Sequence, residues 1–172
     1  MTPEIRALDL GDRGTVDAIV ALQRASYRVE ADLLGARTLP ALTETSRQLR
    51  GSGETFLGAY EDDRLVGAVS WKRSGPLLDI HRMVVHPDRF RRGIAGRLLA
   101  ALDEHEAGVE RTIVATGAEN PPARRLYERH GFTPVEERVV SGSIGIVIYE
   151  RGAASRDAAS QGITPTPPPS GA

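Results

Sequence analysis

Arginines and small residues stand together at positions 91–97, in the order Arg-Arg-Gly-Ile-Ala-Gly-Arg. A helix is predicted to begin after Gly93, because apolar residues recur at three- and four-residue steps from Ile94 to Leu102. The first turn of a helix leaves backbone N–H groups without intrahelical partners and carries the positive end of the peptide dipoles. The residues that add room or charge there are Gly93, Ala95 and Gly96, and Arg91, Arg92 and Arg97. This segment predicts a diphosphate site.

The alternative interpretation of this segment is a surface helix with scattered arginines. Two other phosphate-binding patterns are excluded by the letters. The string G-x-x-x-x-G-K-[ST] does not occur in the chain, and Gly93 and Gly96 have the wrong spacing for G-x-G-x-x-G.

The elements that must hold this turn are a strand before it and a strand after it. Ile80–Val85 is rich in β-branched residues, and Pro87 ends it because proline cannot donate to a sheet. Arg111–Thr116 is predicted as the next strand, after a C-cap at Gly108. A strand, a helix and a strand in this order predict two parallel neighbours.

A second helix with strong end signals is predicted between Asn120 and Gly131. Asn is a favoured N-cap, proline suits the first turn, and Gly131 suits the C-cap. One face of this helix, at three- and four-residue spacing, carries Asn120, Ala123, Arg124 and Tyr127.

The two segments resemble motifs A and B of the GNAT superfamily of N-acetyltransferases. Motif A, [QR]-x-x-G-x-[GA] after a strand ending in V-x-P, is similar to 85–96, except that Phe90 stands where the family most often has Gln or Arg. Motif B, N-x-x-A-x-x-[LF]-Y-x-x-x-G-F, is matched throughout 120–132. The resemblance covers about residues 4 to 150.

The resemblance implies an α/β (α+β) fold. It predicts a mixed, mostly antiparallel sheet of six to seven strands flanked by about four helices, with a parallel, splayed strand pair where coenzyme A binds. It also implies that acetyl-CoA, or another acyl-CoA, is the donor and that a primary amine of a small molecule or peptide is the acceptor. The residues expected to bind the donor are Met83, Val84, Val85, Arg91, Arg92, Gly93, Ile94, Ala95, Gly96, Arg97, Asn120 and Arg124. Pantetheine is expected to pair as an extra strand between Met83–Val85 and Ala115–Thr116.

The catalytic residues expected from the resemblance are Tyr127, Asp79 and His81. Tyr127 would protonate the leaving thiolate, because a phenol keeps its proton at neutral pH. Strand alternation places Asp79 and His81 on one face with Met83 and Val85 if no bulge intervenes, and either residue is a candidate base for the amine. The alternatives are that Asp79 pairs with an arginine and that His81 and Tyr127 only pack.

The acceptor is expected near the N-terminal helices. A helix is predicted at 13–28, followed by a loop at Val29–Ala41 and a short helix capped by Thr45 and Gln48. The carboxylates that could attract a cationic amine there are Glu30, Asp32 and Glu44, although exposed carboxylates are more often only solvated.

The remaining strands are predicted as hairpins. One joins Thr55–Tyr60 to Leu65–Trp71, and the other joins Phe132–Val140 to Ile144–Glu150. Trp71 is expected to pack at the edge of the core and not to contact the acceptor.

The composition limits the classes of function. The 172 residues include 22 basic and 23 acidic side chains, which disfavours a nucleic-acid-coating surface. No cysteine is present, so thiolate nucleophiles and zinc–sulfur sites are excluded, and no metal is expected. Without a signal peptide or a membrane-length apolar run, we expect a cytoplasmic protein with no membrane partner. A homodimer and a non-catalytic acyl-CoA sensor on the same fold are left open.

The chain is expected to divide into a domain at 1–151 and a tail at 152–172. The tail is rich in Ala, Ser and Pro and has little to bury, so it is predicted to be disordered.

Overall fold

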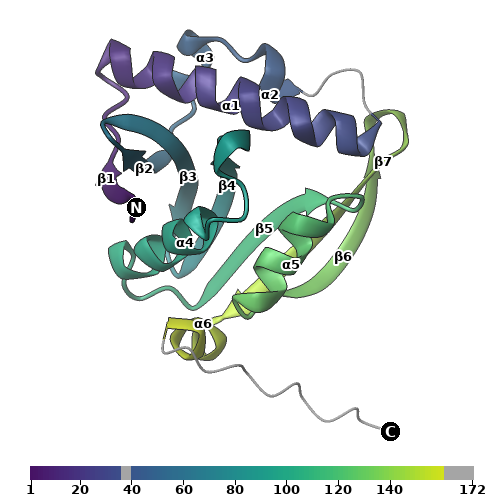
Figure 1. Cartoon of the computed structure of the whole chain (residues 1–172). Helices are drawn as coiled ribbons and strands as arrows, with labels where there is room; N and C mark the ends of the chain where they lie inside the picture. The colour runs from purple at the N-terminus through teal and green to yellow at the C-terminus, as the bar shows by residue number, and fades with distance from the viewer. Residues whose placement is uncertain (36–39, 161–172) are drawn as a thin grey trace, which may run out of the picture.

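A seven-stranded sheet with strand order β1-β2-β3-β4-β5-β7-β6 is the centre of the computed structural model, which describes residues 1–35 and 40–160 (Figure 1). The strands are β1 (Glu4–Ala7), β2 (Thr55–Glu61), β3 (Arg64–Ser74), β4 (Leu77–Val85), β5 (Arg111–Gly117), β6 (Thr133–Val140) and β7 (Ile144–Gly152). The helices are α1 (Arg13–Leu34), α2 (Pro40–Thr43), α3 (Ser46–Arg50), α4 (Ile94–His105), α5 (Pro121–Arg129) and α6 (Ala153–Ser160). Two 3₁₀ turns, η1 (Pro87–Arg89) and η2 (Ser141–Ser143), complete the described elements.

The predicted fold class is confirmed. Every strand pair is antiparallel except β4 and β5, and both predicted hairpins form. The sheet has an apolar cluster on each face. One cluster includes Leu78, Ile80, Leu98 and Leu99 and lies under α4, whereas the other includes Val16, Ile19, Leu49 and Val84 and lies under α1 and α3. The sheet is therefore sandwiched between α1–α3 and α4–α5.

A β-bulge at His81 changes the direction of the side chains along β4. Trp71 of β3 pairs with Ile80 and Ser70 pairs with Arg82, so His81 is an extra residue on β4. Before the bulge Ile80 packs under α4, and after it Val84 packs under α1. Asp79 therefore does not share a face with Met83 and Val85, because the condition for simple alternation is not met.

The parallel strands separate just after this bulge. Pairing between β4 and β5 ends at Ile80 and Val114. The outer partners continue further, since β3 pairs with β4 as far as Val85 and β5 pairs with β7 as far as Gly117. The predicted splay beside Met83–Val85 is thereby confirmed.

Helix α1 is longer than the sequence suggested. The side chain of Asp12 accepts a hydrogen bond from the Thr15 N–H and begins the helix, and Gly35, with φ of 64°, ends it. The predicted loop at Val29–Ala41 is therefore wrong for 29–34, which belong to α1, and for 40–41, which begin α2. Residues 36–39 lie outside the described residues. The capping box of Thr45 and Gln48 at α3 is confirmed.

Two helix ends in the C-terminal half also differ from expectation. Helix α4 ends earlier than Gly108, with Glu106 as its C-cap. Part of the predicted tail forms α6, because Arg156 reaches back to Asp103 of α4 with Nε 2.8 Å from Oδ1. Positions 161–172 are outside the described part of the chain.

Trp71 is buried, and its indole N–H donates to Glu106 at 2.7 Å. Among the described residues, no helix is long and apolar enough to cross a membrane.

Candidate active site

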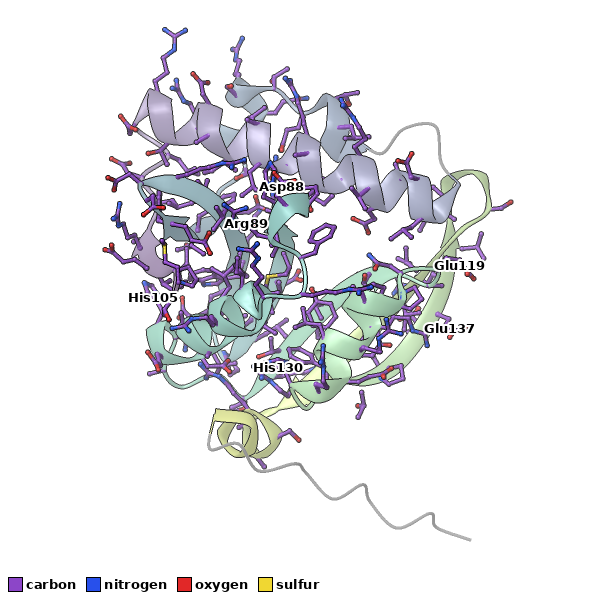
Figure 2. The ribbon with its side chains drawn as sticks, viewed as in Figure 1. Asp88, Arg89, His105, Glu119, His130 and Glu137 are labelled. Atoms are coloured by element: carbon purple, nitrogen blue, oxygen red, sulfur yellow. The ribbon has the colours of Figure 1, made fainter. Side chains whose placement is uncertain are left out.

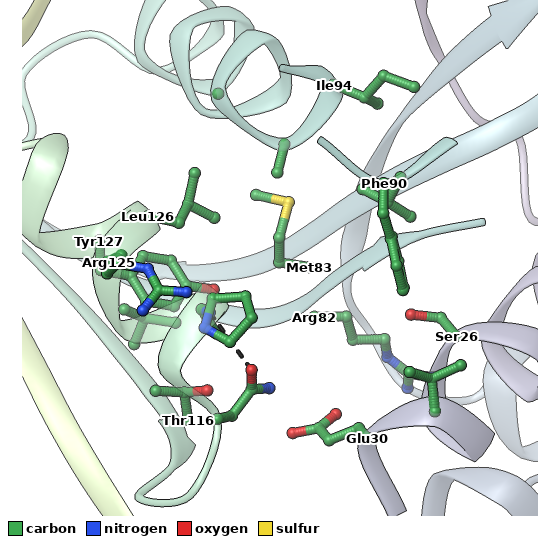
Figure 3. Close-up of a pocket in the computed structure, with 18 of the residues that line it drawn as sticks. Ser26, Glu30, Arg82, Met83, Phe90, Ile94, Thr116, Arg125, Leu126 and Tyr127 are labelled. Atoms are coloured by element: carbon green, nitrogen blue, oxygen red, sulfur yellow. Dashed lines mark hydrogen bonds between the residues drawn. The ribbon is translucent and has the colours of Figure 1, made fainter. Parts of the chain in front are cut away.

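A cavity of about 670 Å³ opens between α1, the splayed ends of β4 and β5, and the N-termini of α4 and α5 (Figure 3). Met83 stands in the middle of this space, with Tyr127 on one side and Phe90 on the other. The predicted donor-binding residues that line the cavity are Met83, Val85, Arg91, Arg92, Gly93, Ile94, Ala95, Gly96 and Asn120. Ala115 and Thr116 line it from β5, so the two strands border the same space.

The N-terminus of α4 is open to the cavity. Its N-cap is Gly93, with φ of 74° and no side-chain cap hydrogen bond. The first helical bond of this turn runs from the Arg97 N–H to the Gly93 carbonyl at 3.1 Å. The N–H groups of the first turn, from Ile94 to Gly96, therefore have no partner within the helix, which is the geometry that suits an anion.

Gly93 and Gly96 are needed for different reasons. At Gly93 a side chain would have free space, but the left-handed backbone is costly for other residues. At Gly96 a Cβ would lie 3.2 Å from Nε2 of His130, which is at the end of α5 (Figure 2). Gly96 therefore lets α4 and α5 approach each other where the cavity begins.

Three of the predicted donor-binding residues do not line the cavity. Val84 is buried under α1, and Arg97 is exposed on α4 away from the cavity. Arg124 donates from Nε to the Tyr149 hydroxyl at 3.0 Å and from a terminal nitrogen to the Ala118 carbonyl at 3.2 Å. Two of its guanidinium nitrogens are therefore bonded to the protein, and its side chain does not line the cavity.

Arginines that were not among the predicted donor-binding residues line the cavity instead of Arg97 and Arg124. Arg125 and Arg129, four residues apart on α5, both line it. Arg89 of η1, in the segment that follows β4 (Figure 2), also lines it, with Nε 2.6 Å from Oε2 of Glu61. The sequence contained these arginines, but the rotation of α5 about its axis relative to the sheet decides which of them line the cavity.

Tyr127 is buried and borders the cavity from α5. Its ring packs against Phe132 and Tyr149, with centroids 5.5 Å and 6.0 Å away. Burial raises the pKa of the Tyr127 phenol, and the negative charge of Glu30 raises it further. The phenol therefore stays protonated across the whole neutral range.

His81 lines the cavity, but Asp79 does not. His81 Nδ1 lies 3.0 Å from Oε1 of Glu54, and Nε2 lies 3.2 Å from Oδ2 of Asp79. Asp79 therefore contacts His81 and not an arginine. Both nitrogens of the imidazole face carboxylates in this arrangement.

A second cavity of about 520 Å³ continues from the first. Tyr27, His81 and Arg82 border both, and Glu44 and Glu54 line the second. Arg82 binds these two carboxylates, with Nε 2.8 Å from Oε2 of Glu54 and a terminal nitrogen 2.9 Å from Oε1 of Glu44. Burial lowers the pKa of Arg82, but its hydrogen bonds to Glu44 and Glu54 raise it more.

Glu30 of α1 also lines the main cavity, whereas Asp32 is exposed and does not. Burial raises the pKa of the Glu30 carboxyl, and the side chain of Asn120 lowers it to a smaller extent. Glu30 was one of three carboxylates expected near the acceptor, and α1 brings it into the cavity because the helix continues to Leu34. No signal in the sequence distinguished it from Asp32.

Comparisons with known proteins agree with this architecture. Residues 52–134 match the family model described as an acetyltransferase (GNAT) domain. The chain is 36% identical over 118 residues to UPF0157 protein YqkA of Bacillus subtilis and 38% identical over 122 residues to mycothiol acetyltransferase of Thermobispora bispora. These matches span 69% and 70% of this chain, but only 34% and 38% of the relatives' own lengths.

The fold is similar to that of the PaiA N-acetyltransferase from Thermoplasma acidophilum, solved in complex with coenzyme A. The TM-score is 0.72 at 20% identity, over 88% of this chain and 99% of that protein. The family match includes β2–β5, α4 and α5, which form the cavity wall opposite α1 and the open helix N-terminus. The chain therefore belongs to the GNAT superfamily of acetyltransferases.

Proposed function

We propose that this protein transfers an acetyl group from acetyl-CoA to a primary amine by direct attack. The proposal rests mainly on one arrangement, in which the splayed β4/β5 pair, the open N-terminus of α4 and the Tyr127 phenol border a single cavity. The coenzyme A complex of the structurally similar PaiA protein and the acetyltransferase name of a sequence relative support the same donor.

Coenzyme A is expected to extend along the cavity from α4 to Tyr127. The N–H groups at the start of α4 would bind the diphosphate, and Arg91, Arg92, Arg125 and Arg129 would add charge at the wall. Pantetheine amides would pair with the strand backbones of Met83–Val85 and Ala115–Thr116. The thioester would then lie near Tyr127.

Direct attack agrees with the composition, because a chain without cysteine cannot form an acetyl-cysteine intermediate. The nucleophile is then the amine itself. An alkylamine of pKa ~10.4 is neutral at pH 7 in about one molecule in 2,500, which costs about 4.6 kcal/mol. The carboxylates at the α1 and β4 end of the cavity would attract the ammonium form, and one of them must accept its proton.

Departure of the thiolate is the other step that needs a proton. Tyr127 would donate it, because the Tyr127 phenol stays protonated at neutral pH and borders the space where the sulfur would lie. The phenolate would regain a proton from the amide nitrogen that forms.

The test combines donor binding with turnover. Binding of acetyl-CoA is measured by calorimetry, and coenzyme A release is measured with a thiol reagent, which has no protein background because the chain has no cysteine. The amines offered are butylamine, spermidine, L-lysine and an alanine-terminated peptide. Binding with amine-dependent thiol release supports the proposal. Binding without release from any amine indicates the non-catalytic sensor, and no binding rejects both functions.

A further inference from the structure

We propose that Glu30 of α1 is the general base of this site, taking the proton from the acceptor ammonium, and that Asn120 is its positioning residue. This inference rests on the proposed acetyltransferase function and names a group for one of its steps.

Glu30 has access to the position where an acceptor would lie. Its side chain points from α1 into the cavity, on the wall across from Met83 and Tyr127 (Figure 3). The phenol of Tyr127 and the carboxylate of Glu30 are close enough to influence each other electrostatically. An amine between them would have a proton acceptor on one side and the thioester carbon on the other.

The other carboxylates around the cavity are already committed. Glu44 and Glu54 both bind Arg82, and Glu54 also meets His81. Asp79 meets His81 and lies outside the cavity wall. Among residues 1–35 and 40–160, no cation forms an ion pair with Glu30. Its carboxylate is therefore free to exchange a proton with a substrate.

The titratable and charged residues that line the cavity with Glu30 include Tyr27 on α1, His81 and Arg82 on β4, Arg89 on η1, and Tyr127 on α5. Arg89 is paired with Glu61. The positive charge of Arg82 is balanced by the carboxylates of Glu44 and Glu54, so it does little to stabilise the ionised form of Glu30. Burial then dominates and raises the pKa of the Glu30 carboxyl. A higher carboxyl pKa narrows the difference between the pKa of Glu30 and that of the amine, so the proton transfer becomes less unfavourable.

Asn120, which begins α5, lines the same cavity as Glu30. Its side-chain oxygen accepts the N–H of Ala123 at 3.3 Å and caps the helix, which leaves its amide nitrogen as the donor toward Glu30. This interaction favours the ionised carboxylate. Asn120 therefore caps α5, which carries Tyr127, and in the proposed role its amide nitrogen orients the carboxylate of Glu30.

The proposed step is balanced in protons and bonds. The ammonium acceptor gives one proton to Glu30, and the neutral nitrogen forms a bond to the thioester carbon. The carbon–sulfur bond then breaks, and the thiolate takes the Tyr127 proton while the new amide nitrogen returns a proton to Tyr127. Glu30 finally releases its proton to water, so the net products are the acetamide, coenzyme A and one proton.

The experiment compares Glu30→Gln with Asp32→Asn, which makes the same neutralising change on an exposed position of the same helix. With acetyl-CoA and the best amine of the panel, kcat/KM is measured from pH 5 to 9. The unmodified protein should lose activity as Glu30 becomes protonated on the acid side, well below the pH at which the amine itself ionises. Glu30→Gln should lose this acid limb and about 10²-fold or more in kcat/KM at pH 7. Asp32→Asn should keep both the acid limb and the kcat/KM of the unmodified protein at pH 7.

A second variant separates a catalytic role from a structural one. Asn120→Asp keeps a good helix cap but places a second negative charge beside Glu30, which raises the pKa of its carboxyl. The acid limb should therefore move to higher pH in Asn120→Asp. A limb that stays in place, or that persists in Glu30→Gln with near-normal activity, would overturn the inference.

Donor binding keeps this inference distinct from the proposed function. Acetyl-CoA affinity should be unchanged within about twofold in Glu30→Gln, as expected for a group that acts on the acceptor. Without turnover by the unmodified protein, the proposed function itself fails. The titration of Glu30, followed by ¹³C NMR of the side-chain carboxyls and assigned with Glu30→Gln, gives a result even then. Titration of Glu30 at the pKa of an ordinary glutamate would contradict the inference, which depends on a buried carboxylate without an ion-pair partner.

Discussion

His81 Nδ1 lies 3.0 Å from Oε1 of Glu54, a carboxylate that is almost fully buried and whose other oxygen receives Arg82. On the opposite side of the ring, Nε2 faces Asp79. A neutral imidazole has one N–H and can donate to only one of these carboxylates. This geometry favours a role for His81 in holding the acceptor end of the cavity together over a role as the base.

Replacement of His81 by glutamine is therefore expected to leave the acid limb of kcat/KM in place. The KM for the amine should rise by about threefold to tenfold, since the second cavity loses a group that bridges two carboxylates. Steady-state kinetics from pH 5 to 9 measure both effects. Loss of the acid limb would instead identify His81 as the base. Asp79→Asn should raise the KM for the amine by less than the His81 replacement does, because Asp79 does not line the cavity.

Tyr127→Phe is expected to lower kcat by about 10²-fold or more, because the thiolate loses its proton donor. Affinity for acetyl-CoA should hardly change. The control is Tyr149→Phe, which removes a hydroxyl bound to Glu128 and Arg124 outside the cavity. Equal losses in kcat and in acetyl-CoA affinity would contradict the acid role.

The pH dependence of kcat offers an independent check on Tyr127. Burial raises its pKa above the ordinary value near 10, so the phenol should remain protonated on the alkaline side. We expect no alkaline decrease of kcat from this group below about pH 10. A decrease near pH 8 that vanishes in Tyr127→Phe would show that the phenol ionises too early to fit this environment.

Gly93→Glu is expected to abolish acetyl-CoA binding, because a negative side chain at the N-terminus of α4 would repel the diphosphate. Gly75→Glu is the matched control. Gly75 has a similar left-handed backbone, with φ of 58°, and equally open space for a side chain, but it lies in the β3–β4 turn. Both variants should lose similar stability, and only Gly93→Glu should lose binding in calorimetry. Tight binding by Gly93→Glu would reject the diphosphate site.

Asp103→Ala should destabilise the fold by about 3–5 kcal/mol. One carboxylate oxygen of Asp103 accepts from Arg151 at 2.7 Å and from Arg156 at 2.8 Å, and both arginines are buried. Burial lowers the pKa of Arg151 while Asp103 opposes this, so removal of Asp103 leaves two charges without compensation. Urea unfolding measures the loss, and Glu104→Ala, an exposed neighbour, should lose less than about 0.5 kcal/mol.

Glu44 is expected to make stability depend on acid pH. Burial raises the pKa of its carboxyl, but hydrogen bonds from Arg82 and Gln23 lower it more, so the net shift is downward. A lowered folded-state pKa gives stability that is complete above the unfolded value near 4.5 and is lost as the pH falls through the folded value. Glu44→Gln should therefore be less stable than the unmodified protein at pH 7, with a smaller difference at pH 3. A constant difference across this range would contradict the ion pair.

Local signals in the sequence were sufficient for the two ligand-facing helices and the fold class. The glycine at position 93 and the asparagine at position 120 act on their own turns, so their effects do not depend on distant residues. The strand–helix–strand order between Ile80 and Arg111 likewise permits few arrangements. These features located the start of α4 and the helix that carries Tyr127, both of which border the cavity.

The acceptor side could not be predicted in the same way. The bulge at His81 depends on how β3 and β4 pair, and it moved Asp79 away from the face of Met83. The extension of α1 to Leu34, despite a broken apolar rhythm, carries Glu30 into the cavity. Arg125 lines the cavity and Arg124 does not, because the side of α5 that carries Arg124 faces Tyr149.

The sequence by itself determined where the helices of the donor site begin, which residues stand at their first turns, and that no cysteine takes part. Only the tertiary structure decided which carboxylates and which arginines line the cavity. The physical reason is that caps and turns act over a few neighbouring residues, whereas strand register and helix phase are set by packing between elements that are distant in the chain.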